Sequence, residues 1–284
     1  MNVSMNEAIN ELDWVECGSV NKIDLPYLNS TEFCDSDNDQ IRDLARVITR
    51  RAKNEKEAAI EVFEWVKERL VYRVGLYKEP ASVSIQKMAG SCSNKANVFV
   101  ALMRSLNVPA GYHISTVKTR DYFGPYCVER FSKFMSLKSY HVYAGVKLDG
   151  KWIKVDPTDD SGLTNGTKHI APQAKPVFFD GENDAMLNLN SRHIIDDTMQ
   201  CLSSIDDIFR RKVRCSAEAI EIMNLYMDFM RTDGKKHLTV PPFVEAFFEY
   251  FAQKHPKKYS SFLKLERQLE QMVYNRMSEP ELQR

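Results

Sequence analysis

The sequence predicts an α+β protein in which helices pack on an antiparallel sheet, followed by a helical C-terminal extension. Apolar residues recur at helical spacing in residues 41–70 and again in residues 92–106. Segments rich in Val, Ile, Tyr and Trp come next, and a strong hairpin signal joins two of them. Beyond residue 199 the helical spacing returns. Helices that precede neighbouring antiparallel strands are typical of the α+β class.

The composition indicates a folded protein of one large or two small domains. The chain has 284 residues, of which 43% are hydrophobic and 27% are charged. Lys plus Arg and Asp plus Glu both number 39, so no net charge attracts a polyanion and we expect no nucleic-acid partner. The sequence has no long apolar run, and its start lacks the basic and apolar parts of a signal peptide. We therefore expect a cytoplasmic protein with no membrane partner.

Metal binding is not predicted. The cysteines are sparse, no export signal accompanies them, and we expect reduced thiols; they are Cys17, Cys34, Cys92, Cys127, Cys201 and Cys215. They form no CxxC pair, and the histidines form no HxxxH spacing. Asp35, Asp37 and Asp39 begin like a calcium loop, but Gln40 and Arg46 stand where that loop needs Gly and Glu. A helix N-terminus, which favours acids, explains them better.

The first part of the chain is predicted to hold an irregular arm and then helices. Residues 1–35 show little periodicity. Two helices follow, whose apolar residues share one face: Leu44, Ala45 and Ile48 in the first, and Ala59, Phe63, Val66 and Leu70 in the second. Residues 90–110 predict a loop and then a helix that ends near Asn107 and Pro109. Cys92 would therefore lie at a helix N-terminus.

Strands and a second helical region are predicted after residue 110. Residues 110–118, 139–148 and 151–156 read as strands. Residues 164–192 carry no period and predict a long loop that could cover a cleft. The later helices are marked by three stripes: Ile220, Met223, Met227 and Met230; Phe243 to Phe251 after Pro241 and Pro242; and Phe262, Leu265, Leu269 and Met272. We interpret these stripes as core, with a partner groove as the alternative.

The hairpin register brings a histidine and an acid together. With Asp149 and Gly150 as the turn, Tyr143 pairs with Asp156. His141 is then a diagonal neighbour of Asp156 on the same face, roughly 7 to 8 Å away at the backbone, so the carboxylate can reach the imidazole. The alternate positions point to the other face and are predicted to be core: Val142, Ala144, Val146, Ile153 and Val155.

These residues are the parts of a Cys-His-Asp triad. A helix N-terminus stabilises the thiolate of Cys92, and a histidine held by a carboxylate can take up and return a proton. The strings GSCSNKANVFVALMRSLNVPA and YHVYAGVKLDGKWIKVDPT resemble the core of the transglutaminase-like superfamily, over about residues 40–160. That family has a papain-like fold. The resemblance implies Cys92 as nucleophile, His141 as base and Asp156 as the acid that orients it.

The resemblance extends to supporting positions. Residues that fit the family's pattern are Ala96, Leu102, Arg104, Val108, Pro109, Ala110 and Trp152. The sequence departs from the pattern at Gly111, Tyr143 and Gly145, where Arg, Trp and Glu are common in the family. Gln86 stands six residues before Cys92, the spacing of an oxyanion donor in papain-like enzymes, although a surface position is the favoured interpretation.

The resemblance implies a cysteine acyltransferase that needs no cofactor. We expect amide-bond formation through an acyl-enzyme thioester, from a thioester or amide donor to an amine acceptor, in small-molecule biosynthesis. An acyl carrier protein could deliver the donor, since residues 118–138 hold five basic and two acidic residues. A peptidase or amidase that uses water is one alternative, and a non-catalytic interaction module is another.

The same reading predicts how the chain is divided. We expect an N-terminal arm over residues 1–35 and a transglutaminase-like catalytic core over residues 36–165. A loop or linker over residues 166–198 and a helical C-terminal region over residues 199–284 follow.

Overall fold

The helices of the core come first along the chain, and the sheet follows them. The structure is a computed structural model that describes residues 22–75, 78–119, 129–132, 135–187, 191–210 and 217–278. It begins with the 3-10 turn η2 (Leu25–Tyr27), α1 (Asp39–Ile48), α2 (Glu55–Arg69), α3 (Ala81–Lys87) and α4 (Cys92–Ser105). The short strands β1 (Val71–Tyr72) and β2 (Ala89–Gly90) pair in parallel between them. Helices α1, α2 and α4 confirm the prediction, and α3 is an addition to it.

Asparagine side chains begin the first two helices. Asn38 Oδ1 accepts a hydrogen bond from the Gln40 N–H at 2.9 Å, and Asn54 Oδ1 accepts one from the Glu57 N–H at 2.9 Å. Such caps satisfy N–H groups that have no partner within the helix. The acids at residues 35–39 thus stand at a helix N-terminus, as predicted.

The main sheet has four antiparallel strands in the order β5-β4-β3-β6. These are β3 (Ala110–Lys118), β4 (Lys138–Leu148), β5 (Lys151–Val155) and β6 (Ile194–Asp197). The first three confirm the predicted strands. Strand β6 was not expected, because it lies inside the segment 166–198 that the sequence predicts to be a loop or linker. It pairs with β3 at the edge of the sheet.

The predicted register of the hairpin is confirmed from the turn to the pair of Ala144 and Val155, and the ladder ends before the predicted pairing of Tyr143 with Asp156. Asp149 and Gly150 form the turn, with φ of +49° and +78°. The ladder then runs from Leu148 opposite Lys151 to Ala144 opposite Val155. Every predicted core position on this hairpin is buried: Val142, Ala144, Val146, Ile153 and Val155.

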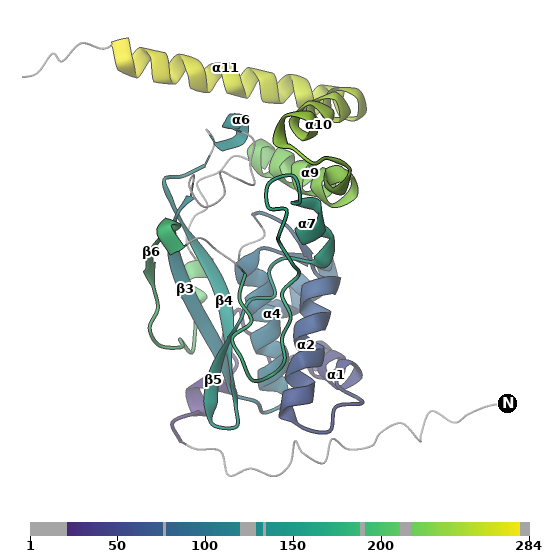
Figure 1. The fold of residues 1–284 in the computed structure, drawn as a ribbon. Helices are drawn as coiled ribbons and strands as arrows, with labels where there is room; N and C mark the ends of the chain where they lie inside the picture. Colours follow the sequence, from purple (N-terminus) through teal and green to yellow (C-terminus); the bar gives the residue numbers. More distant parts are fainter. Residues whose placement is uncertain are drawn as a thin grey trace, which may run out of the picture.

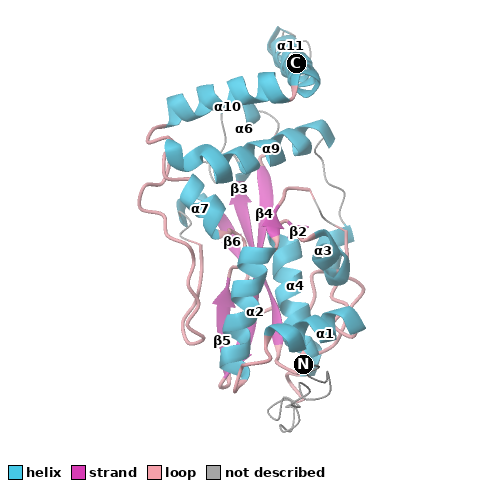
Figure 2. Cartoon of the chain, turned by 90° about the vertical axis from the view of Figure 1, so that its right-hand side faces the viewer, coloured by secondary structure: helices cyan, strands magenta, loops and turns pink. Residues whose placement is uncertain are grey.

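Helix α4 lies between the sheet and the other N-terminal helices (Figure 2). Every residue from Cys92 to Arg104 is buried, as expected for a helix covered on all sides. Even Lys95 is fully buried, and its Nζ donates to the carbonyls of Lys67 and Leu70 at 3.0 and 2.8 Å. These carbonyls belong to the C-terminal end of α2, where a cation is favoured. The position of Cys92 is therefore fixed by a rigid element.

A layer of helices lies across one end of the sheet (Figure 1). It contains α9 (Ala217–Asp233), η5 (Gly234–Lys236), α10 (Val240–Lys254) and α11 (Pro256–Ser278). Helix α7 (Ser161–Gly166) lies against α9, and the remaining short elements are α6 (Glu129–Ser132), η4 (Ser191–His193) and α8 (Asp206–Arg210). No helix in the described ranges combines the length and apolar character that a bilayer span requires.

Aromatic side chains form the core of this layer. Phe243, Phe247, Phe251 and Phe262 are buried together, which confirms the core interpretation of the Phe stripes. Phe131 of α6 adds its ring to the cluster, 5.7 Å from the ring of Phe247. Aromatic pairs at such distances contribute about 0.5–1.5 kcal/mol beyond their buried area.

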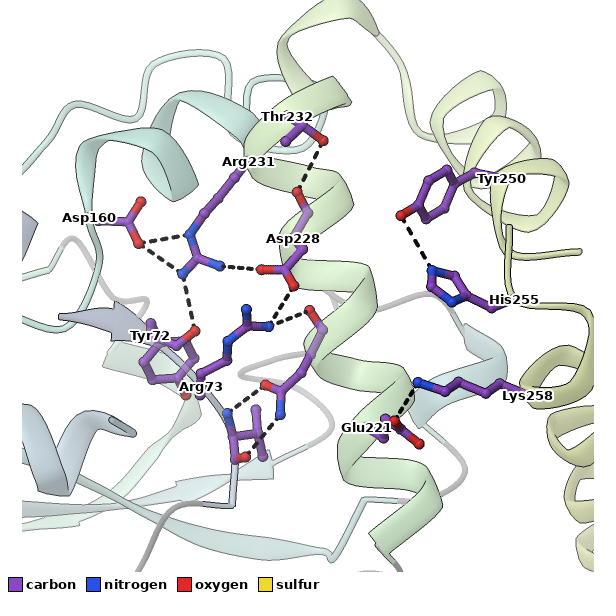
Figure 3. Close-up of polar contacts among 12 residues, drawn as sticks. Tyr72, Arg73, Asp160, Glu221, Asp228, Arg231, Thr232, Tyr250, His255 and Lys258 are labelled. Carbon is purple, nitrogen blue, oxygen red and sulfur yellow. Dashed lines mark hydrogen bonds and ion pairs between the residues drawn. The ribbon is translucent and has the colours of Figure 1, made fainter. Parts of the chain in front are cut away.

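Ion pairs join α9 to the core (Figure 3). Arg231 of α9 binds Asp160, the N-cap of α7, at 2.8 Å, and it donates to the carbonyl of Tyr72 at 3.1 Å. Arg73 binds Asp228 of α9 at 2.6 Å. These contacts hold α9 against the N-terminus of α7 and against β1 with the residue that follows it.

Candidate active site

Cys92 is the first residue of α4. The side chain of Asn94 fixes this helix start, because its Oδ1 accepts from the N–H and the hydroxyl of Ser91 at 3.2 and 2.7 Å. A thiolate at this end of a helix is stabilised by the N–H groups and the dipole of the helix. The Cys92 side chain is 6% exposed, so it remains close to the surface of the core.

His141 and Asp156 form a short, buried hydrogen bond. His141 Nε2 lies 2.7 Å from Asp156 Oδ2, and both residues are buried. The other carboxylate oxygen of Asp156 accepts from the Thr158 N–H at 3.2 Å. The main chain of Asp156 leaves the hairpin ladder and donates its N–H to the Ala185 carbonyl at 2.8 Å. The carboxylate is therefore fixed from two sides.

The structure brings Cys92 against His141. His141 and the backbone N–H of Val142 both act on the Cys92 thiol and lower its pKa, and Cys92 in turn raises the pKa of His141. Because Nε2 binds Asp156, Nδ1 is the ring nitrogen left for Cys92. All three residues predicted from the sequence thus meet in one place.

The electrostatics favour an ion pair in this group. Burial by itself would raise the pKa of Cys92, but the hydrogen bond and the charge of His141, with the Val142 N–H, lower that pKa overall. Burial would lower the pKa of His141, but Asp156 and the hydrogen bond to Cys92 raise it well above its usual value. The two shifts have opposite signs, so both favour the pair of a thiolate and an imidazolium over the neutral pair.

Other predicted residues lie away from this group. Gln86 is exposed on α3 and donates to Gln40 Oε1 at 2.9 Å, which confirms the surface interpretation. Cys34 and Cys201 are buried free thiols, and burial raises the pKa of both, that of Cys201 to about 12. The remaining cysteines lie outside the described residues: Cys17, Cys127 and Cys215.

The basic loop at residues 118–138 is described only in part. Residues 120–128 and 133–134 lie outside the described ranges. Lys118 and Lys138 are exposed, whereas Arg130 binds Glu266 of α11 through two hydrogen bonds of 2.7 and 2.5 Å. One of the five basic residues in this segment is therefore already engaged within the molecule.

A cavity of about 600 Å³ lies beside His141. Its lining comes from the core, from α9 and from the long segment after β5, which agrees with the expectation that this segment could cover a cleft. The cavity is mainly apolar, and its apolar side chains include Leu163, Val177, Met186, Leu187, Met227 and Met230. The sequence did not identify this cavity, because its walls come from distant segments.

Two of the three departures from the family pattern, Gly111 and Gly145, have a structural explanation. A Cβ on Gly111 would lie 2.7 Å from Cys201 Sγ and 2.5 Å from the Leu202 carbonyl oxygen. A Cβ on Gly145 would lie 2.9 Å from the same sulfur. The segment at residues 201–202 occupies the space that larger side chains would need, so glycine is required at both positions.

Comparison with known proteins agrees with this geometry. Residues 42–157 match the model of the transglutaminase-like superfamily. The match covers less than half of the chain, and this region is therefore similar to a superfamily of papain-like fold that contains cysteine peptidases and transglutaminases. No match was found among curated proteins.

Two solved structures are similar to part of the chain. One is a proposed cysteine protease from Cytophaga hutchinsonii, at 20% identity and a TM-score of 0.39, with 49% of this chain and 43% of that chain covered. The other is a proposed protease from Parabacteroides distasonis, at 9% identity and a TM-score of 0.32, with 48% of this chain and 26% of that one covered. The chain thus spans less than half of the length of either protein.

Proposed function

We propose that this protein is a cysteine acyltransferase that forms amide bonds through an acyl-enzyme thioester. The observation that supports this proposal is the contact of Cys92, at a helix N-terminus, with the buried pair of His141 and Asp156. These groups can perform both halves of an acyl transfer.

In the first half, the Cys92 thiolate attacks the carbonyl carbon of a thioester or amide donor. The carbonyl π bond opens, and the backbone N–H at the start of α4 is placed to stabilise the oxyanion. When the carbonyl reforms, the bond to the leaving group breaks, and the His141 imidazolium gives its proton to the departing thiolate or amine. Asp156 keeps the ring oriented and favours its charged form.

In the second half, an amine attacks the acyl-enzyme. His141, now neutral, takes the proton of the attacking nitrogen, and Cys92 leaves as the thiolate. The products are an amide and the starting ion pair, so no cofactor is consumed. Water in place of the amine would give hydrolysis, which is the peptidase or amidase alternative. The mainly apolar cavity beside His141 supports transfer. Its walls bind an apolar amine and disfavour water, so the amine has the higher local concentration beside the acyl-enzyme.

The most specific part of the proposal is that an acyl carrier protein delivers the acyl donor. It is supported by the basic character of residues 118–138, where Lys118 and Lys138 are exposed. Acidic carriers would be attracted to such a segment over a Debye length of about 8 Å at physiological salt.

The test is intact-mass spectrometry with a panel of acyl thioesters, with and without amines. Wild type should gain one acyl group, and added amine should release it as an amide. Cys92→Ala should gain none while keeping the melting temperature of wild type within a few degrees. Acylation of Cys92→Ala would overturn the proposal. Release of free acid alone, over a broad amine panel, would favour the hydrolase.

A further inference from the structure

The cavity beside His141 is lined by a carboxylate that has no hydrogen-bond or ion-pair partner in the part of the chain that the structure describes. Asp159 lines the cavity three residues after Asp156, and it is half-buried. Within the described ranges, its side chain makes no hydrogen bond and no ion pair. The neighbouring Asp160 differs, because Arg231 and the Leu163 N–H bind it. Asp159 is therefore a carboxylate in the lining of the cavity that no described side chain neutralises by direct contact.

An uncompensated carboxylate in such a place is costly. Burial is the main cause that raises the pKa of Asp159 to about 6, with Asp156 adding to the effect. At neutral pH the group is still mostly ionised, and it lacks the partner that a buried charge needs. The charge of the buried Lys95 partly offsets this rise in the pKa of Asp159, but Lys95 Nζ donates to the carbonyls of Lys67 and Leu70 and makes no ion pair with Asp159 among the described residues. A ligand that brings a positive charge would satisfy Asp159.

The charges around this part of the cavity also favour a cation. Cys92 and Asp156 carry negative charge in the ion-pair state, and His141 and the buried Lys95 carry positive charge. These four charges cancel, which leaves the charge of Asp159 uncompensated. At the open side, Asp184 and Lys175 are exposed and of opposite sign. The field in the cavity is therefore that of one carboxylate.

The remaining lining of the cavity indicates to what kind of ligand the positive charge belongs. The walls formed by the segment after β5 and by α9 are mainly apolar, and a volume of about 600 Å³ accommodates a chain of several carbon atoms or a ring. Two buried hydroxyl groups on the wall, those of Thr158 and Thr164, also have no hydrogen-bond partner among the described residues. After rotation of either threonine side chain, its hydroxyl group could form a hydrogen bond with a ligand in the cavity.

We infer that the cavity binds the part of the substrate that consists of an apolar chain bearing a protonated amine, with the ammonium group at Asp159. This inference deepens the proposed function, and it rests on that function for the identity of the ligand as a substrate. Two sources share this chemistry: an acyl donor with an amino group on its chain, and an acceptor with a second amine.

The first arm of the test measures binding without chemistry. Cys92→Ala would be titrated with n-hexylamine, 1-hexanol and hexanoate at pH 7.5, with ligand-detected NMR to obtain dissociation constants. Hexylammonium should bind more tightly than the other two. Asp159→Asn should weaken hexylammonium binding about tenfold and leave hexanol within about twofold. Each methylene added to a short amine should strengthen binding about fourfold.

Two control variants test whether the loss of hexylammonium binding is specific to Asp159. Asp184→Asn removes the same charge from the exposed side of the cavity, where solvent screens it, and should leave hexylammonium binding within about twofold. Met227→Ala should weaken hexylammonium and hexanol equally, since it removes apolar wall from both. Equal binding of hexanoate and hexylammonium, or an unchanged dissociation constant in Asp159→Asn, would overturn the inference.

The second arm distinguishes the sources in the wild-type enzyme. If the donor occupies the cavity, an ω-aminohexanoyl thioester should acylate Cys92 faster than a hexanoyl thioester, and Asp159→Asn should abolish the difference. If the acceptor occupies it, hexane diamine should release the acyl group faster than hexylamine, with the same dependence on Asp159. If Cys92 is never acylated while Asp159-dependent binding persists, the proposed function fails and the cation site stands.

Discussion

The hydroxyl of Tyr143 donates to the carboxylate of Asp197, and both carboxylate oxygens lie 2.9 Å from it. The ring of Tyr143 lies between two imidazoles, 5.2 Å from His113 and 6.0 Å from His141 between ring centroids. Asp197 belongs to β6, outside the segment 42–157 that matches the superfamily. The ring beside the candidate base is thus held by a residue from a later part of the chain.

We predict that Asp197 and Tyr143 position His141. Tyr143→Phe and Asp197→Asn should each lower kcat about tenfold with little change in KM, because the ring of Tyr143 loses its anchor and the base loses its orientation. Steady-state kinetics over a pH range would test this. Lys154→Met is the control, since Lys154 also binds Asp197, at 3.4 Å, but stands opposite Gly145 in the sheet and not opposite His141. A change in KM alone would assign the pair to substrate binding instead.

The reactivity of Cys92 should extend to low pH. Its pKa is lowered and that of His141 is raised, so the thiolate exists between the two pKa values, below the pH of about 8.5 at which a free thiol ionises. Removing His141 leaves burial as the main influence, and burial raises the pKa of the thiol. In His141→Ala, the pH midpoint of iodoacetamide labelling at Cys92 should therefore rise.

Asp156→Asn should produce a smaller rise in the same midpoint. The variant retains the imidazole and its hydrogen bond to Cys92, but it loses the charge that favours the imidazolium. Peptide mass spectrometry of the labelled Cys92 peptide, across pH 5 to about 10, would measure all three profiles. Coincident profiles near the midpoint of a free thiol would show that Cys92 is not coupled to His141.

Restoring bulk at the two glycines of the sheet should destabilise the protein. Gly145→Ala forces a Cβ against Cys201 Sγ and should lower the free energy of unfolding by about 1–3 kcal/mol. In a Cys201→Ala background this loss should shrink, because the sulfur is gone. Gly111→Ala should stay destabilising there, since its Cβ also meets the Leu202 carbonyl oxygen. Urea unfolding of the three single variants and the two double variants would test the cycle, and equal losses in both backgrounds would contradict it.

The attachment of α9 should depend on Arg231. Arg231→Ala leaves Asp160 without its partner, and we expect a loss of about 1–3 kcal/mol in the free energy of unfolding. Lys258→Ala breaks an exposed pair with Glu221 and should cost less than about 1 kcal/mol (Figure 3). Chemical denaturation followed by circular dichroism would compare them. Similar losses for the two variants would show that the Arg231 contacts contribute no more than a surface pair.

Local patterns account for the parts of the fold that were predicted correctly. The register of the hairpin follows from a two-residue turn and the alternation of side chains, so His141 and Asp156 could be placed on one face before the structure was known. The helix start at Cys92 follows from the loop that precedes a long apolar stripe. Both signals lie within a few residues of the positions they determine.

Long-range pairings account for what was missed. Strand β6 has four residues, two of them Asp, so it lacks the apolar alternation that marks a strand, and its partner β3 stands far back in the chain. Asp197 was missed for the same reason. The cavity was missed because Tyr72, Asp159 and Met227 meet only after three distant segments have packed together.

The walls of the cavity come from two parts of the chain, and these parts can change independently in evolution. Cys92, His141 and Asp156 lie in the segment that matches the superfamily, whereas Met227 and Met230 come from α9, well beyond it. Substitutions in α9 can reshape the cavity while the reacting groups stay untouched. Related proteins could therefore keep the same reaction and differ in substrate through substitutions in α9 alone.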